Sequence, residues 1–151
     1  MAAKLHSITG TAYWAKLFER NRDKGEYHEA TDGITSIDLL LDKEALDYLK
    51  KTGSRLRPRV TEEGVVVKFR RPWVHNSIEA FGGAPRVVNK DNETWDNTVS
   101  IGNGSEVEVF FSVYDTTKGT GTRMEGVRVL NHVEYEVPED QRKESGIKLP
   151  F

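Results

Sequence analysis

The sequence predicts one mainly β domain whose strands curl into a partly open barrel. Two segments, residues 106–114 and 127–137, alternate apolar and polar residues, which is the period of a half-buried strand. Further short segments are rich in Thr, Val, Ile and aromatic residues, and only one segment has the pattern of a helix. Five or six strands that do not alternate with helices favour a small sheet that closes on itself to hide its edges.

Length and composition limit the possible classes of protein. A chain of 151 residues is the size of one domain, and 36% hydrophobic with 30% charged residues is compatible with a small core and a charged surface. The absence of cysteine excludes disulfides, thiolate zinc sites and cysteine nucleophiles, and it fits a reducing cytoplasm. No apolar run resembles a signal peptide or approaches the roughly 20 residues of a membrane span, so we expect no membrane contact.

The first half of the chain contains two predicted strands and the helix. Residues 8–18 form a long strand with a bend at Gly10, residues 19–33 form a polar loop, and residues 34–41 form the second strand. Asp42 is placed as the N-cap of a helix over residues 43–51, which has acidic residues early, lysines late and Gly53 just beyond its end.

The second half is predicted to be built from hairpins. Residues 54–60 and 65–71 flank a turn at 62–64 and form a basic hairpin, and a short strand around Val87 and Val88 lies between two loops. The strand 106–114 places Val107, Val109, Phe111 and Val113 on the core face. It pairs with the strand 127–137 across an exposed Gly/Thr-rich loop at 115–126.

The charges are unevenly distributed. The net charge is only −2, which by itself argues against a simple binder of polyanions. Residues 50–73, however, hold eight basic against two acidic residues, a net charge of +6, so the remainder of the chain carries −8. Clustered charge of one sign costs stability unless a polyanion binds it, which favours a function for the basic hairpin.

Signals of catalysis and of metal binding are absent from the sequence. It contains no nucleophile elbow, phosphate loop, metalloprotease helix or EF-hand loop, so no enzyme and no cofactor are expected. The four histidines, at 6, 28, 75 and 132, lack metal-ligand spacing. Gly102-Asn103-Gly104 precedes a strand rather than a helix and is interpreted as a turn. Asp91 and Asp96 leave an enzyme open as an alternative, although turns explain acidic residues at such positions.

Aromatic and cationic residues interleave along the predicted strands. A protein that binds single-stranded nucleic acid without sequence preference needs rings that stack on bases beside cations that pair with phosphates. Trp14, Lys16 and Phe18 share a strand face at period two, and Lys68 and Arg70 share another. The predicted phosphate-binding residues are Lys16, Arg55, Arg57, Arg59, Lys68, Arg70, Arg71 and Lys118. The predicted stacking residues are Trp14, Phe18, Trp73 and Tyr114, although rings in a small barrel often fill the core instead.

Four segments resemble a known family. They are TAYWAKLFE at 11–19, PRVVNKDN at 85–92, IGNGSEVEVFFSVY at 101–114 and GVRVLNHVEY at 126–135. Together they resemble the oligonucleotide/oligosaccharide-binding (OB) single-stranded DNA-binding proteins of tailed bacteriophages, including the T7-like replication proteins. The resemblance covers most of residues 5–137 and implies a five-stranded antiparallel Greek-key barrel with one short helix. It also implies protection of single strands during phage DNA replication and recombination in the host cytoplasm.

The end of the chain departs from the pattern of that family. Such proteins usually end in a long acidic tail with a terminal aromatic residue that binds replication partners. Here residues 138–151 are only weakly acidic and end in Leu149-Pro150-Phe151, so the division is an OB domain over 1–137 and a tail with Phe151 as a partner contact. The alternative is a β-sandwich virion or assembly protein whose basic hairpin contacts a protein partner. The oligomeric state, monomer or dimer, and the choice between DNA and RNA stay open.

Overall fold

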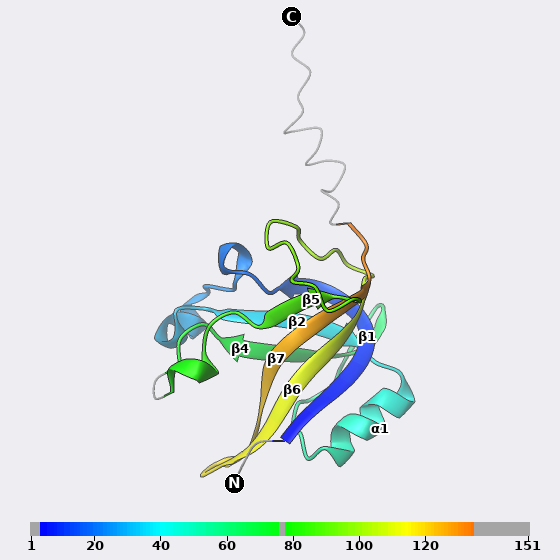
Figure 1. Ribbon diagram of the computed structural model, residues 1–151. Coiled ribbons are helices and arrows are strands. Elements are labelled where there is room, and N and C mark those ends of the chain that lie inside the picture. Colours follow the sequence, from blue (N-terminus) through cyan, green and yellow to red (C-terminus); the bar gives the residue numbers. More distant parts are fainter. Residues whose placement is uncertain (1–3, 76–77, 135–151) are drawn as a thin grey trace, which may run out of the picture.

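All strands of the computed structural model, which describes residues 4–75 and 78–134, belong to one sheet (Figure 1). Its strands are β1 (Lys4–Lys16), β2 (Ile34–Leu40), β3 (Arg59–Thr61), β4 (Gly64–Pro72), β5 (Arg86–Asn89), β6 (Glu106–Thr116) and β7 (Gly119–Asn131). The helix α1 spans Lys43–Lys51, and short 3-10 turns lie at η1 (Glu19–Asn21), η2 (Glu26–Thr31) and η3 (Glu79–Phe81). The predicted mainly β architecture is confirmed.

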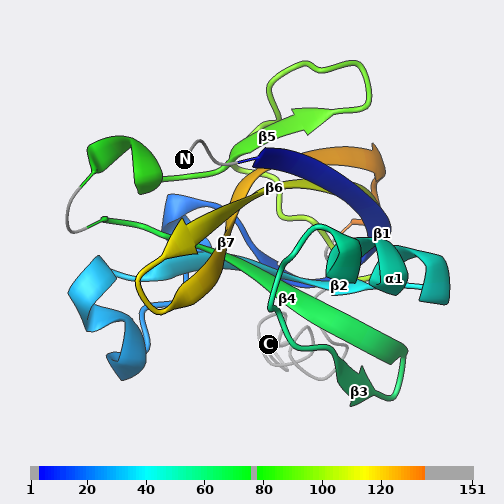
Figure 2. The same ribbon diagram turned by 90° about the horizontal axis from the view of Figure 1, so that it is seen from below.

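The sheet curls into a barrel that stays open along one seam. Within the described residues the strand order is β3-β4-β2-β1-β6-β7-β5, and every pair is antiparallel except β5 with β7. Figure 2 shows β4 and β7 next to each other at this seam, but no backbone ladder joins them. The structure therefore has two short strands, β3 and β5, beyond the five that the resemblance implies.

The core fills the inside of this curl. Val107, Val109 and Phe111 are fully buried, as the alternation of residues 106–114 predicts, while Val113 is half-buried at the edge. From the facing strands β2 and β4 come the other main members of the core, Ile37, Leu39, Val67 and Phe69. In the middle of β2 and β4, the outward positions carry polar and charged side chains, Ser36 and Asp38 on β2 and Lys68 and Arg70 on β4.

The helix α1 closes one end of the barrel. Its predicted N-cap is confirmed, because Asp42 Oδ1 accepts a hydrogen bond of 2.8 Å from the backbone N–H of Ala45. Leu49 is buried against the core, and the last turn ends at Thr52 just before Gly53. Within the described part of the chain, no helix is long and apolar enough to span a membrane.

Strand β1 differs from its prediction in both bounds and shape. It begins at Lys4, and Gly10 continues the regular pairing with Val107 rather than bending the strand. Gly10 is needed for a different reason, since a Cβ there would lie 2.4 Å from the carbonyl oxygen of Leu40. The irregularity comes later, between Tyr13 and Lys16, where β1 bulges against β2.

The predicted loop at 115–126 is wrong, because β6 and β7 continue as a ladder down to Thr116 and Gly119. Threonine favours extended backbone. Gly121 leaves room for the Tyr114 ring, because a Cβ at residue 121 would lie 2.5 Å from that ring. Residues 117 and 118 are the actual turn. The proposed tail at 138–151, with Phe151, lies outside the described residues, as does the end of the segment predicted over 127–137.

Candidate nucleic-acid interface

Four cations from three strands, β1, β3 and β4, gather on the outer face of the sheet. Strand register pairs Lys16 with Ser36 and Ser36 with Arg70, so these three residues form one row across β1, β2 and β4. The next row along is Tyr13, Asp38 and Lys68. Directly opposed residues point to the same side of a sheet, and Arg59 of β3 reaches this side as well. We call Lys16, Arg59, Lys68 and Arg70 the basic face.

A buried carboxylate organises part of the basic face. Asp38 is 3% exposed, and its Oδ2 accepts a close charge-assisted hydrogen bond from Arg59 Nη2. Lys68 Nζ lies 3.9 Å from the other oxygen, Oδ1. Asp38 thus orients two of the cations and offsets part of their charge, whereas Lys16 and Arg70 form no ion pair within the described residues.

The loop between β1 and β2 borders this face. Asp23 accepts a hydrogen bond from the Gly25 N–H, and this bond, together with the nearby cations Lys16, His28 and Lys68, lowers the pKa of its carboxyl below the ordinary 3.8. In the same loop Tyr27 is 90% exposed. Sequence reasoning missed Tyr27 and the half-buried Tyr13 as possible stacking rings; an aromatic residue within a polar loop was the available signal for Tyr27.

Arg71 is not part of the basic face, contrary to its prediction. It is 8% exposed and lies at the seam between β4 and β7. Its guanidinium donates to the carbonyl oxygens of Gly82, Gly83 and Met124 and pairs with Glu125 at 2.8 Å. Burial lowers the pKa of Arg71, and the Glu125 carboxylate opposes that shift. The role of Arg71 is to join β7 and the segment 82–83 to β4 where backbone bonds are missing.

Phe18 is likewise enclosed, at 7% exposure, and belongs to the hydrophobic core. Its predicted place beside Trp14 and Lys16 is wrong because the β1 bulge ends the alternation before residue 18. Trp73 is half-buried, with the Arg22 guanidinium 4.7 Å from the centre of its ring. Trp14, in contrast, is 65% exposed.

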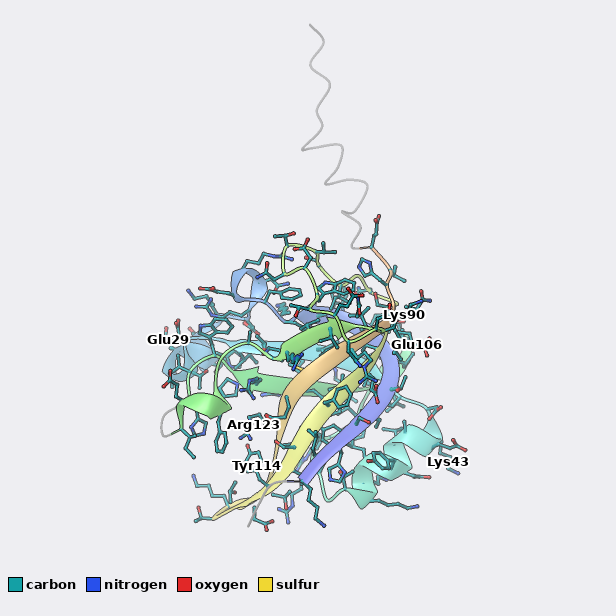
Figure 3. All side chains as sticks on the ribbon, viewed as in Figure 1. Glu29, Lys43, Lys90, Glu106, Tyr114 and Arg123 are labelled. Atoms are coloured by element: carbon teal, nitrogen blue, oxygen red, sulfur yellow. The ribbon has the colours of Figure 1, made fainter. Side chains whose placement is uncertain are left out.

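Most of the remaining predicted residues lie near the tip of the β6–β7 hairpin. Arg55 approaches Gly119 and Lys118 is exposed in the turn beside it, so these two cations form a separate basic group. The Tyr114 ring is half-buried, and Figure 3 shows it next to Arg123, whose guanidinium lies 5.0 Å from the ring centre. Arg57 is exposed in the irregular segment before β3. The six basic residues of 55–71 therefore do not converge on one site.

The other candidate sites have ordinary structural roles. Asp96 accepts hydrogen bonds from the backbone and hydroxyl of Thr98, which lower its pKa, and Asn89 accepts from the N–H of Asp91, so both acidic residues belong to turns. In the part of the chain that the structure describes, no group of three or more potential ligands could hold a metal ion.

Comparison with solved structures identifies proteins of the same fold. The chain is similar to the crystal structure of gp2.5, a single-stranded DNA binding protein encoded by bacteriophage T7, with a TM-score of 0.62 and 16% identity over 99% of this chain and 98% of that one. It is also similar to the single-stranded DNA-binding protein of bacteriophage Enc34, with a TM-score of 0.56 and 15% identity over 95% and 90% of the two chains. No protein-family model and no curated protein matches the sequence. The predicted OB fold and the likeness to phage proteins of this kind are confirmed.

Proposed function

We propose that this protein binds single-stranded DNA without sequence preference, by contact between phosphates and the basic face. The observation that carries the proposal is the cross-strand register, which brings four cations from three strands to one side of the sheet around Tyr13. An unpaired strand exposes both its charged backbone and its flat bases, and it therefore suits a surface on which cations lie beside aromatic rings. Nothing in the proposal requires a chemical step, so the function is binding rather than catalysis.

The position of the basic face within the fold supports this proposal. In OB folds oligonucleotides bind across the second and third strands of the barrel, between the first loop and the last hairpin. Here those strands are β2 and β4, and β4 carries both Lys68 and Arg70. The loop with Tyr27 and the hairpin tip with Arg55 and Lys118 are the flanking elements. The solved structures that share the fold are described as single-stranded DNA-binding proteins.

The lack of base-specific geometry supports tolerance of sequence. Lys16 and Arg70 are exposed cations on long side chains, and Arg59 is held by Asp38 rather than aimed at a base edge. Phosphate contacts of this kind fix the position of a strand and carry no sequence information. We propose protection of transient single strands during phage DNA replication and recombination in the bacterial cytoplasm as the wider role. The proposed tail around Phe151 would contact replication proteins.

Salt dependence tests the basic face directly. Each phosphate contact to a single strand contributes about −0.7 to the slope of log affinity against log salt, so four contacts predict a slope of about −3. Replacing Arg70 by Ala is expected to weaken binding of oligo-dT about tenfold at low salt and to reduce the magnitude of the slope by about 0.7. Fluorescence anisotropy of labelled oligo-dT at several salt concentrations measures both quantities.

Lys90→Ala is the matched control for this experiment. Lys90 is an exposed cation just after β5, at the opposite end of the strand order from β3 (Figure 3). The change removes the same charge, and we expect an unchanged slope. Equal slopes for the native protein and for Arg70→Ala would contradict the placement of DNA on the basic face, and failure of the native protein to bind oligo-dT would contradict the function itself.

A further inference from the structure

Trp14 has a backbone conformation that large side chains rarely adopt. Its φ is 51°, in the left-handed region, and its side chain is 65% exposed. Between Tyr13 and Lys16 the strand has two residues, Trp14 and Ala15, where β2 offers one between the paired positions. This bulge turns the ring out of the sheet. An exposed ring gains little from packing, so packing does not explain why a strained position carries tryptophan.

The Gly102-Asn103-Gly104 turn holds this bulge in place. The backbone N–H of Trp14 donates to Asn103 Oδ1 at 2.8 Å, although the two residues are 89 positions apart. The turn is itself fixed to β1, because the Gly104 N–H donates to the Ala12 carbonyl at 2.9 Å and the Ala12 N–H donates to the Ser105 carbonyl at 2.7 Å. A side chain at Gly102 would meet the Val133 carbonyl oxygen at 2.4 Å. The glycines therefore place Asn103 beneath the bulge.

A hollow of about 320 Å³ opens beside the Trp14 ring. Its walls include Trp14, Lys16 and Arg20, so the ring shares this hollow with two cations. Arg20 is held in place, since its Nε donates to the Asn97 carbonyl at 3.0 Å and its Nη2 donates to Ser100 Oγ at 2.9 Å. Lys16 also belongs to the basic face, so the hollow continues directly from it.

We propose that Trp14 stacks one nucleobase of the bound single strand, and that Asn103 is the positioning residue that holds the ring ready for it. This proposal rests on the proposed function, because the stacked base belongs to the strand whose phosphates contact the basic face. Three features select a nucleobase as the occupant: a flat exposed ring, flanking cations that suit the adjoining phosphates, and continuity with the basic face through Lys16. Stacking on a ring that is already fixed loses little conformational freedom upon binding.

Affinity and fluorescence of Trp14 variants test the stacking. Loss of one stacked ring is expected to weaken binding of oligo-dT about 5- to 150-fold in Trp14→Ala, whereas Trp14→Phe retains most of the affinity. Tyr48→Ala removes another exposed ring, on α1, and should bind as the native protein does. With Trp73→Phe and Trp95→Phe combined, the emission comes from Trp14 alone, and oligo-dT should quench it. The difference in quenching between the native protein and Trp14→Phe gives the same information with all other residues unchanged.

The role of Asn103 has a readout of its own that does not involve DNA. In the protein with Trp14 as its sole tryptophan, Asn103→Ala removes the acceptor of the Trp14 N–H and should lower the steady-state anisotropy of the indole emission. Asn103→Asp keeps an acceptor oxygen at the same place and should restore that anisotropy. Equal anisotropy in all three proteins would overturn the positioning role.

The outcomes separate this inference from the proposed function. If the native protein binds oligo-dT with the expected salt slope, but Trp14→Ala binds equally well and Trp14 emission is not quenched, the stacking proposal is wrong and the function stands. If the native protein does not bind oligo-dT, the function is wrong and the stacking proposal fails with it. Quenching together with weaker binding of Trp14→Ala supports both.

Discussion

Arg70 and Arg71 are neighbours in the sequence, and the pleat of β4 sends their side chains to opposite sides of the sheet. Arg70 is exposed on the basic face, without an ion pair in the described residues. Arg71 is buried at the seam, where it satisfies three carbonyl oxygens and the Glu125 carboxylate. Two identical side chains thus have separate surroundings: one lies on the face proposed to bind DNA, and the other joins the strands at the seam.

The pair allows a reciprocal experiment. Arg71→Ala removes the donor of three carbonyl oxygens and leaves the Glu125 carboxylate with Arg123 as its remaining ion-pair partner, so we expect the free energy of unfolding to fall by about 1–3 kcal/mol. Arg70→Ala changes an exposed side chain and should alter that free energy by no more than about 0.5 kcal/mol. Urea unfolding measures stability and oligo-dT anisotropy measures binding. Loss of affinity at native stability in Arg71→Ala would contradict the assignment.

Alternation of residues along a strand predicts the side of the sheet that each side chain faces, correctly where the strand is regular and wrongly where it is not. It placed Lys68 and Arg70 opposite Val67 and Phe69, as the structure has them. It could not place Phe18, because no local signal in the sequence marks the bulge that ends the alternation of β1. The bulge is held by a hydrogen bond to Asn103, a partner that lies far along the chain and is brought close only by the fold.

At the scale of elements, the approach of β1 to β2 depends on a single missing side chain. The sequence indicated that the strand bends at Gly10, whereas the structure shows a regular ladder to β6 on one side and the end of β2 in close contact on the other. A Cβ at residue 10 would lie 2.4 Å from the Leu40 carbonyl oxygen and 2.8 Å from Leu39 Cγ. Backbone at this contact cannot move aside as the end of a flexible side chain could.

Gly10→Ala should therefore separate β1 from β2. We expect a loss of about 1–3 kcal/mol in the free energy of unfolding, the usual cost of overpacking. The neighbouring Thr9→Ala alters an exposed residue of the same strand and should change stability by about 0.5 kcal/mol or less. Chemical denaturation of both variants makes the comparison, and equal stability of Gly10→Ala and the native protein would show that the contact yields without cost.

At the scale of the whole molecule, the charges are distributed unevenly, with basic residues concentrated on one face. The chain has a net charge of −2, yet the basic face collects four cations from three strands. The composition of residues 50–73 indicated such a concentration, and its true extent appeared only with the strand register, which adds Lys16 and removes Arg71. The surplus cations also stabilise the ionised form of Asp23 at the border of the face.

The lowered pKa of Asp23 predicts a pH dependence with a definite sign. Because the folded-state pKa lies below the ordinary 3.8, the ionised carboxylate contributes stability that is present above 3.8 and is lost as the pH falls through the lowered value. Asp23→Asn should therefore be less stable than the native protein at pH 7, and the difference should disappear in acid. Urea unfolding of both proteins between pH 7 and pH 2.5 tests this. A difference that persists in acid would assign the effect to lost hydrogen bonds instead.

The central place of β1 has a consequence for biosynthesis. β1 pairs on one side with β6, and Lys4 lies opposite Val113. This pairing can form only after residues more than a hundred positions further along the chain have been synthesised. Until β6 leaves the ribosome, the nascent chain exposes a strand edge with unpaired backbone groups, and its hydrophobic core is incomplete. The barrel therefore cannot close before β6 has been synthesised, and pairing between strands so far apart in sequence favours slow folding.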